Sequence, residues 1–220
     1  MNINFELYKV FYEVANQKSI SKGAEKLMIS QPAVSQSIQT LENEFLAKTI
    51  IIATGARNKK LNIKGEEENI GRGLSYCAVC DGAFYKDKIV AVVGGGNSAL
   101  EEAIYLTQFV KKAYLIHRRD IFRADDIVQK RAQKNNKIEF VLNSVVEEIL
   151  ADEKVYAIKI KNNLTNKTQE LKIDGIFPYI GQEPNAELFS GQIEQDKYGF
   201  IITGNSIENN GLTEVFIKFM

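Results

Sequence analysis

The segment that most constrains the fold of this chain is KIVAVVGGGNSALEEA, residues 88–103. A short apolar run rich in valine indicates a buried strand, and the pattern after the glycines indicates a helix. Gly94, Gly96 and Ala99 match the G-x-G-x-x-G/A spacing at the turn between them. Glycine lets the backbone approach a pyrophosphate, whose charge then lies at the helix N-terminus. A dinucleotide-binding turn is therefore predicted, and a glycine-rich turn without a ligand is the alternative. The candidate cofactor-binding residues are Gly94, Gly95, Gly96, Asn97, Ser98 and Ala99.

The chain beyond this turn alternates between strand-like and helix-like segments. The expected strands are 88–96, 112–120 and 137–143, the expected helices are 98–109 and 124–134, and β-rich stretches follow at 145–162 and 169–181. Strands separated by helices are typical of a parallel sheet with helices packed on it. The sequence thus predicts an α/β, Rossmann-like fold for this region.

The end of the second expected strand indicates which dinucleotide is bound. An NAD site places an acidic residue there, about twenty residues after the turn, to bind the ribose 2′-hydroxyl. This chain has His117, Arg118 and Arg119 at that point, and Arg123 follows. Guanidinium groups suit a 2′-phosphate, so the sequence favours NADPH. A solvated basic surface is the alternative interpretation.

Both cysteines of the chain lie in SYCAVCDGAFY, residues 75–85, as a C-x-x-C pair of Cys77 and Cys80. Zinc needs about four ligands, whereas the chain has two cysteines and one histidine, so no metal site is predicted. A redox pair is favoured, because two intervening residues allow a small disulfide ring whose thiolates can be tuned. Asp81 follows directly and is placed to return a proton to a leaving thiolate. A buried, inert pair is the alternative.

The overall composition argues against several classes of protein. Lys and Arg number 28, as do Asp and Glu, so no net charge draws the chain to nucleic acid or to a membrane. The longest apolar runs are far too short to span a bilayer, and the N-terminus lacks the pattern of a signal peptide. A reducing cytoplasm is the expected location, where a C-x-x-C pair is more often catalytic or metal-binding than structural.

Residues 1–45 have a different pattern from the rest of the chain. Apolar residues recur at helical spacing, and Ser30 followed by Pro32 indicates the start of a helix. The pattern changes near residue 46, where AKTIIIATGA (47–56) predicts a buried strand and a tight turn at Gly55. No Gly/Ser/Pro linker separates the two patterns, which suggests a junction between unrelated segments.

Five motifs occur in the order found in low-molecular-weight bacterial thioredoxin reductases: IIIATGA, CAVCDGAFY, VVGGGNSALEEA, HRRDIFRA and IGQEPNAELF. This resemblance covers about residues 47–203. It implies that NADPH passes hydride to FAD, that FAD reduces the Cys77–Cys80 disulfide, and that the dithiol reduces a thioredoxin-like protein. It also implies that Cys80 faces the flavin, Cys77 attacks the partner's disulfide and Asp81 is the general acid. The glycine turn would hold the NADPH pyrophosphate, and Arg118, Arg119 and Arg123 would hold the 2′-phosphate.

The same resemblance divides the chain into domains. The implied parts are an FAD-domain remnant at 46–59 that includes Thr54 and Gly55, an NADPH-binding domain with the C-x-x-C pair at 60–179, and a C-terminal FAD-domain remnant at 180–220. One glycine fingerprint is present, and it belongs to NADPH. The FAD-domain strands are thus expected to be incomplete, with FAD binding and turnover impaired. A homodimer is one expected assembly.

Residues 19–44, SISKGAEKLMISQPAVSQSIQTLENE, resemble the helix-turn-helix of LysR-type transcriptional regulators. By this resemblance the helix from Ser30 to Glu42 enters the major groove of DNA. Residues 1–45 carry four Lys and Arg against five Glu, and the basic wing expected after that helix is absent, so the segment alone should bind DNA weakly. The alternatives to a reductase are a DNA-binding regulator fragment and an inactive chimeric remnant. For residues 1–45, the alternative to a helix-turn-helix is a helical cap on the α/β domain. The DNA-contacting candidates are Gln31, Pro32, Ser35, Gln36 and Gln39.

Overall fold

The computed structural model describes residues 5–44 and 52–202, which belong to two compact units that divide between Ala53 and Thr54. Within residues 5–44, the first unit consists of helices α1 (Phe5–Gln17), α2 (Ile20–Leu27) and α3 (Gln31–Glu44). The Ser30 hydroxyl accepts a hydrogen bond from the Ala33 N–H at 3.3 Å, and this confirms the expected start of α3.

The core of the first unit is small and takes one buried apolar side chain from each helix. Val10, Ala24 and Val34 are buried, with half-buried apolar side chains packed around them. Gly23 lets α1 and α2 approach closely, because a Cβ at this position would lie 2.7 Å from Val14 Cγ2. A three-helix arrangement with this few buried side chains gains limited stability from apolar burial.

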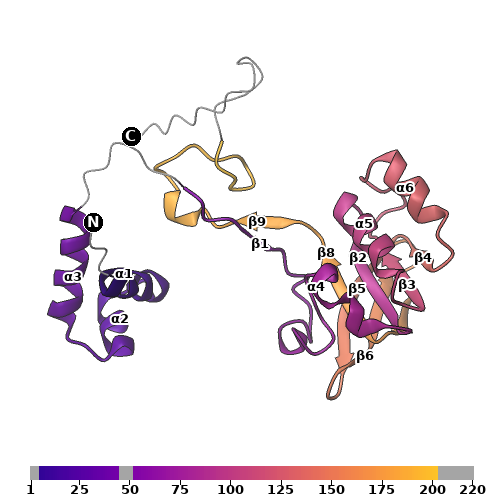
Figure 1. Ribbon diagram of the computed structural model, residues 1–220, viewed down its shortest axis with the longest axis horizontal. Helices are drawn as coiled ribbons and strands as arrows, with labels where there is room; N and C mark the ends of the chain where they lie inside the picture. The colour runs from indigo at the N-terminus through magenta and orange to yellow at the C-terminus, as the bar shows by residue number, and fades with distance from the viewer. Residues whose placement is uncertain (1–4, 45–51, 203–220) are drawn as a thin grey trace, which may run out of the picture. The chain divides into compact units, whose positions relative to one another are not determined.

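The second unit, within residues 52–202, contains a parallel sheet in the order β4-β3-β2-β8 (Figure 1). Its strands are β2 (Ile89–Gly94), β3 (Lys112–Ile116), β4 (Ile138–Val141) and β8 (Gly175–Tyr179), and all neighbours in it run parallel. The predicted α/β fold with a parallel sheet is therefore confirmed.

Different elements bury the two faces of this sheet. Val90 and Val92 of β2 pack with helices α5 (Asn97–Leu106) and α6 (Asp126–Gln133). Ala91 and Val93 pack on the other face with an antiparallel sheet in the order β5-β6-β7. Because successive side chains of a strand point to opposite faces, burial of both faces requires the nearly continuous apolar run seen in β2. The antiparallel strands are β5 (Ser144–Ala151), β6 (Val155–Asn162) and β7 (Thr168–Lys172).

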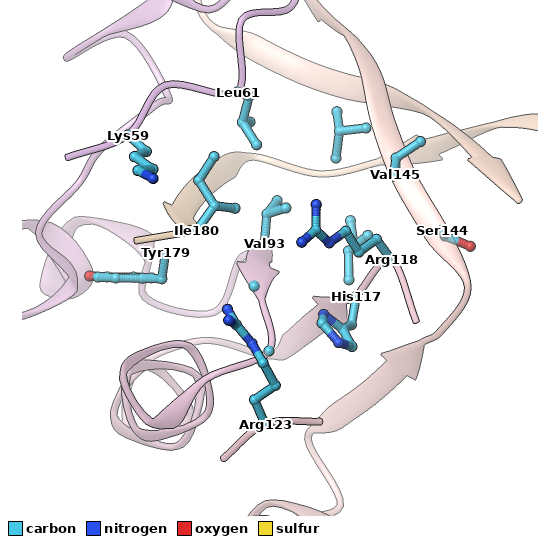
Figure 2. A pocket seen from close by; sticks show the side chains of 14 residues that line it. Lys59, Leu61, Val93, His117, Arg118, Arg123, Ser144, Val145, Tyr179 and Ile180 are labelled. Carbon is cyan, nitrogen blue, oxygen red and sulfur yellow. The ribbon is translucent and has the colours of Figure 1, made fainter. Parts of the chain in front are cut away.

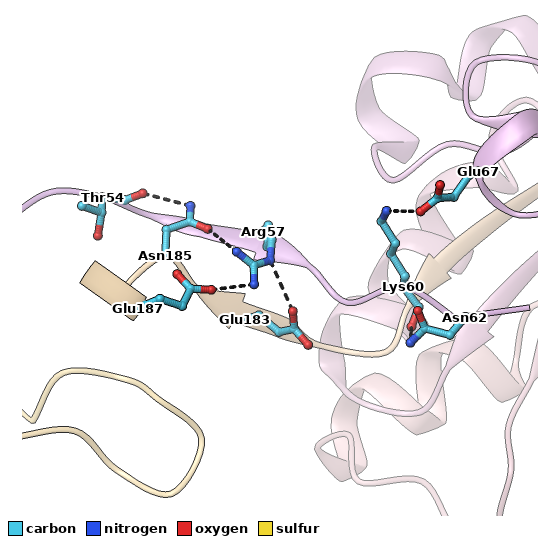
Figure 3. A network of polar contacts seen from close by, with 8 residues as sticks. All are labelled: Thr54, Arg57, Lys60, Asn62, Glu67, Glu183, Asn185 and Glu187. Atoms are coloured by element: carbon cyan, nitrogen blue, oxygen red, sulfur yellow. Dashed lines mark hydrogen bonds and ion pairs between the residues drawn. The ribbon is translucent and has the colours of Figure 1, made fainter. Parts of the chain in front are cut away.

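A short antiparallel ribbon joins β1 (Ala56–Asn58) to β9 (Gln182–Pro184), with Arg57 opposite Glu183. The Arg57 guanidinium donates to Glu183, Asn185 and Glu187 (Figure 3). Half of the segment 47–56, residues 47–51, lies outside the described residues, and residues 52–55 are not in a strand. The strand was predicted to precede a turn at Gly55, and in the described part this was wrong, because pairing with β9 begins only at Ala56.

Two further boundaries differ from the expected ones. The strand expected at 112–120 ends at Ile116, and the chain then forms a loop that closes back when the Arg123 N–H donates to the Gly95 carbonyl at 2.7 Å. The helix expected to reach residue 109 ends at Leu106, because a turn closed by the Val110 N–H and the Leu106 carbonyl follows. The remaining short helices are η1 (Glu67–Asn69), α4 (Ala78–Asp81), η2 (Gly82–Tyr85) and η3 (Glu187–Phe189).

Candidate functional site

The glycine turn after β2 is packed too tightly for side chains at its first two positions. Gly94 has φ +157°, and a Cβ there would lie 2.4 Å from the Tyr179 carbonyl oxygen and 2.7 Å from Ala99 Cβ. A Cβ at Gly95 would lie 2.2 Å from the His117 ring. At Gly96, the residue that precedes α5, a Cβ would meet no atom within 4 Å. The first two glycines are thus packed against neighbouring residues, whereas the third is open on the side from which a ligand would approach. A turn that binds phosphate requires this arrangement.

A cavity of about 390 Å³ lies over this turn. Figure 2 shows Arg118 and Arg123 beside Val93, with Tyr179 and Ser144 at opposite sides of the view. A dinucleotide of mixed apolar and anionic character suits walls that combine aliphatic side chains with cations. The lining residues are Lys59, Leu61, Val93, Gly94, Gly95, Ile116, His117, Arg118, Arg123, Ser144, Val145, Val146, Tyr179 and Ile180.

Two of the three predicted arginines line this cavity. Arg118 and Arg123 do so, and the Arg123 backbone is fixed because its N–H donates to the Gly95 carbonyl at 2.7 Å. Arg119 is exposed and is not among the described residues that line the cavity. Its carbonyl accepts a hydrogen bond from the Asn143 N–H at 3.2 Å. The sequence thus identified residues 117–123 as a basic loop, and the fold decides which of its side chains line the cavity.

His117 lies beneath the glycine turn as a buried ring. It is 6% exposed, its Nε2 lies 3.1 Å from the Ile121 carbonyl oxygen, and it stacks on Phe122 with ring centroids 5.2 Å apart. Burial lowers the pKa of His117, and the neighbouring arginines lower it further. The ring therefore supports Gly95 by packing rather than by adding charge to the cavity.

The other predicted turn residues divide between structure and surface. The Asn97 side chain accepts from the Asp125 N–H at 2.7 Å and donates to the Asp125 carboxylate at 2.8 Å, so it ties α5 to the start of α6. Ser98 is exposed in the first turn of α5, whereas Ala99 is fully buried. Ser98 is consequently the turn residue whose side chain is free of the core and at the helix N-terminus.

Several cavity residues were missed by the sequence reasoning. Lys59 precedes the α/β core, Ser144 begins β5, and Tyr179 ends β8. Each comes from a segment far from the glycine motif in sequence, and none has a local pattern that would mark it. Their position follows from the order of strands in the sheets, which sequence periodicity does not specify.

The C-x-x-C pair forms a disulfide at the start of α4. Cys77 and Cys80 are bonded with Cα atoms 5.3 Å apart, and the Cys77 sulfur accepts the Cys80 N–H at 3.1 Å. Cys80 is exposed and Cys77 is half-buried. Two further backbone amides of this turn are held by side chains: the Cys77 N–H donates to Ser75 Oγ at 3.0 Å, and the Ala78 N–H donates to the Tyr179 hydroxyl at 2.8 Å. An exposed sulfur in a fixed turn can undergo thiol–disulfide exchange, which an inert buried pair cannot.

Asp81 follows the disulfide on the last turn of α4 and is half-buried. Its N–H donates to the Cys77 carbonyl at 3.1 Å, and its charge contributes to the raised pKa of both Tyr85 and Tyr179. The carboxyl thus lies in the same neighbourhood as the disulfide, as a proton donor to a leaving thiolate would need to.

The described parts of the chain bring together neither a cluster of metal ligands nor a second glycine-rich cradle. Within residues 5–44 and 52–202, no group of three or more His, Cys, Asp or Glu side chains is arranged to hold a metal ion, and no helix is long and apolar enough to cross a membrane. Thr54 and Gly55 lie next to the β1–β9 ribbon, where their carbonyls accept hydrogen bonds from Asn185 at 3.0 Å. This described ribbon contains no second glycine-rich strand–turn–helix unit.

The predicted DNA-contacting residues lie on the exposed side of α3. Gln31, Pro32, Ser35, Gln36 and Gln39 are all exposed, while Val34 between them is fully buried. The helix therefore presents a polar row to solvent and an apolar row to its own core, as the sequence pattern predicted.

Comparison with known proteins gives one consistent result. The family model for pyridine nucleotide-disulphide oxidoreductases matches residues 6–217. A thioredoxin reductase of Listeria innocua is 45% identical over 167 residues, which are 76% of this chain and 52% of the relative. A thioredoxin reductase of Helicobacter pylori is 48% identical over 172 residues, 76% of this chain and 55% of the relative. The chain thus spans about half the length of the curated relatives it matches.

Solved structures agree with the sequence relatives. The crystal structure of Lactococcus lactis thioredoxin reductase in its FR conformation is 49% identical with a TM-score of 0.69, covering 72% of this chain and 53% of that one. The thioredoxin reductase of Streptococcus pyogenes is 38% identical with a TM-score of 0.65, covering 87% of this chain and 71% of that one. On these grounds the chain belongs to the pyridine nucleotide-disulphide oxidoreductase family.

Proposed function

We propose that the second unit is the nucleotide-binding and disulfide-bearing part of a thioredoxin-reductase-type oxidoreductase, which uses NADPH and FAD to reduce a thioredoxin-like protein in the cytoplasm. One observation carries this proposal: an arginine-lined cavity over a glycine turn and a partly exposed C-x-x-C disulfide occur in the same compact unit. The thioredoxin reductases to which the chain is similar support the same assignment. In domain terms, residues 60–179 form the NADPH-binding domain, and 46–59 and 180–220 belong to an FAD-binding part.

The cavity residues fit NADPH. The pyrophosphate would lie at Gly96 and the N-terminus of α5, where the open side of the turn and the helix dipole favour an anion. Arg118 and Arg123 would hold the 2′-phosphate through charge-assisted hydrogen bonds. Bound NADPH supplies a hydride; the protein supplies the position and excludes water through apolar walls such as Val93 and Ile180.

The disulfide residues fit the exchange reaction with a protein partner. In the reduced pair, the Cys77 thiolate attacks one sulfur of the partner's disulfide; the partner's S–S bond breaks, a mixed disulfide with Cys77 forms, and the partner's other sulfur leaves as a thiolate. The Cys80 thiolate then attacks Cys77, which restores the bond seen here and releases the partner's second thiolate. Asp81 protonates a departing thiolate. Exposed apolar side chains beside the pair, Val79 at 63% and Phe84 at 77% exposure, offer the partner a contact surface.

FAD fits the described residues poorly. Thr54, Gly55 and the β1–β9 ribbon are the described parts assigned to its domain, and they bring together no phosphate cradle within residues 52–202. We expect the chain alone to bind NADPH without reducing its disulfide at a useful rate, since hydride transfer to a disulfide needs a flavin between them.

A spectroscopic titration tests this function. The purified chain is scanned in the visible range, then again after FAD and after NADPH are added. We expect no bound flavin and NADPH binding with little turnover. Flavin bands that bleach on addition of NADPH would instead show that the chain is a competent enzyme. Such a result would require a flavin site formed jointly by the two chains of a homodimer. A chain that binds neither nucleotide would contradict the proposal.

Arginine variants test the 2′-phosphate assignment. Arg118→Ala should weaken NADPH binding by about 10-fold or more and leave NADH nearly unchanged, because one charge-assisted contact to the phosphate is lost. Arg119→Ala is the matched control, since Arg119 is exposed outside the cavity lining. Isothermal titration with both nucleotides measures the ratio. Equal losses for NADPH and NADH in Arg118→Ala would refute the assignment.

A second function, DNA binding by a LysR-type helix-turn-helix, is supported by the exposed polar row on α3. Gln31, Ser35 and Gln39 would face the major groove, with Pro32 and Gln36 beside them. The four Lys and Arg against five Glu in residues 1–45 predict weak binding. A mobility-shift assay at low salt, with a dimeric fusion of residues 1–45 as control, tests it; no shift with either protein would contradict this function.

A further inference from the structure

Tyr179 is in contact with both parts of the candidate site. It lines the cavity over the glycine turn, and its hydroxyl accepts the Ala78 N–H of the disulfide helix at 2.8 Å. In Figure 2 its ring lies at the edge of the cavity with the hydroxyl directed away from Arg118. The side chain therefore spans the distance between the nucleotide cavity and the Cys77–Cys80 turn.

The backbone of Tyr179 is fixed against the cradle itself. It pairs with Gly94 at the end of the parallel sheet, and its carbonyl lies so close that a Cβ at Gly94 would be 2.4 Å away. Burial raises the pKa of Tyr179 to about 12, so the phenol stays protonated at neutral pH. A neutral hydroxyl on a fixed backbone is a suitable anchor for one backbone N–H.

The disulfide closes a covalent ring around the backbone N–H that this hydroxyl binds. Ala78 lies inside the ring that the disulfide closes, and the Cys77 sulfur also accepts the Cys80 N–H in the same turn. Reduction breaks this covalent link, which leaves the hydrogen bond between Ala78 and Tyr179 without its support. We expect the first turn of α4 to loosen as a result, so that the Tyr179 ring is held less firmly at the cavity wall.

We propose that Tyr179 is a positioning residue that couples occupation of the nucleotide cavity to the redox state of the Cys77–Cys80 disulfide. This inference rests on the proposed nucleotide site. With the disulfide closed, the hydrogen bond to Ala78 holds the ring as a preformed wall, and the nucleotide binds more tightly. Because coupling between two sites is reciprocal, a bound nucleotide also favours the disulfide over the dithiol by the same factor.

The test measures this coupling on the full chain with NADP⁺, which cannot reduce the protein. Its affinity is measured by isothermal titration for the oxidised chain and for the chain reduced by excess dithiothreitol. The reagent gives two electrons and two protons to the cysteines and becomes its own cyclic disulfide. We expect binding to the oxidised chain to be about 2- to 10-fold tighter, the range that one hydrogen bond supplies. Saturating NADP⁺ should shift the equilibrium with dithiothreitol by the same factor.

Two variants remove the hydrogen bond from opposite sides. Tyr179→Phe deletes the acceptor and keeps the ring. Ala78→Pro deletes the donor at the first position of α4, where the missing N–H of proline removes no hydrogen bond within the helix. Both should reduce the affinity ratio towards one. Tyr114→Phe is the control, because its hydroxyl, 3.2 Å from the Lys112 amine, lies on β3; it should keep the wild-type ratio.

The outcomes distinguish failure of the coupling from failure of nucleotide binding itself. A ratio lost in both variants and kept in Tyr114→Phe supports the coupling, which a merely structural role of Tyr179 would not change selectively. Equal or reversed affinities of the oxidised and reduced wild-type chain, or a ratio that survives in both variants, would overturn it. Failure of the wild-type chain to bind NADP⁺ in either state would overturn the proposed nucleotide site itself.

Discussion

The two units of this chain use their polar residues in opposite ways. In the second unit the site is part of the core: Gly94 is packed against Tyr179 and Ala99, and His117 is buried below Gly95. In the first unit the polar residues of α3 are exposed over a core of Val10, Ala24 and Val34. In the second unit, a substitution in the core should therefore change both the stability and the ligand affinity. In the first unit, a core substitution should change the stability without altering the exposed polar residues of α3.

The largest effect is expected from the core of the second unit. Leu100→Ala on α5 should cost about 2–5 kcal/mol of unfolding free energy, because a fully buried side chain is removed from a large packed cluster. Urea unfolding followed by circular dichroism measures the loss. The affinity for the nucleotide should fall as well, because α5 follows directly from the glycine turn. Unchanged affinity in a strongly destabilised variant would contradict the claim that stability and binding are linked in the second unit.

The next largest effect is expected at the turn itself. Gly94→Ala should cost about 1–3 kcal/mol, because the backbone conformation disfavours a side chain and the new Cβ would clash with the Tyr179 carbonyl. Gly96→Ala is the matched control: a Cβ there meets nothing within 4 Å, so stability should stay near wild type. Its NADPH affinity should still fall, since the methyl group occupies the open side of the turn. Equal stability losses in both variants would contradict this reasoning.

A smaller and local effect is expected in the first unit. Val34→Ala should cost about 1–2 kcal/mol from lost apolar burial. The loss should appear in residues 5–44 alone, because the buried neighbours of Val34 all belong to that unit. Hydrogen exchange read by mass spectrometry resolves the two units. Faster exchange in β2 or α5 as well would mean that the units do not behave independently.

The smallest effect is expected from an ion-pair cluster at the surface of the second unit. Hydrogen bonds from Lys159 and Lys64 lower the pKa of Glu148 to about 2, below its usual value of about 4.3. A lowered carboxyl pKa stabilises the fold above about pH 4, and this contribution is lost as the pH falls towards 2. Wild type should therefore be slightly more stable than Glu148→Gln at pH 7 and equal to it near pH 2. A difference that is constant with pH would contradict this assignment.

Local sequence was a good guide wherever a function depends on neighbouring residues. The strand, turn and helix around Gly94 to Ala99, the disulfide of Cys77 and Cys80, and the cap at Ser30 were predicted and are present. Each depends on spacing within about ten residues, for which glycine flexibility, ring closure or an orphan N–H gives a direct physical reason.

The tertiary structure decided what distant segments contribute. It turned Arg118 and Arg123, but not Arg119, to the cavity, and it brought Lys59, Ser144 and Tyr179 to the same walls. It also set Ala56–Asn58 against Gln182–Pro184 and the Tyr179 hydroxyl on the Ala78 N–H. These contacts between distant segments depend on strand order and register. Local sequence does not specify them, because both faces of the sheet must be buried at once for a given pair of strands to become neighbours. The sequence alone determined the chemistry of the glycine turn and of the disulfide. The packing of the sheets decided that Tyr179 contacts both the glycine turn and the helix that carries the disulfide.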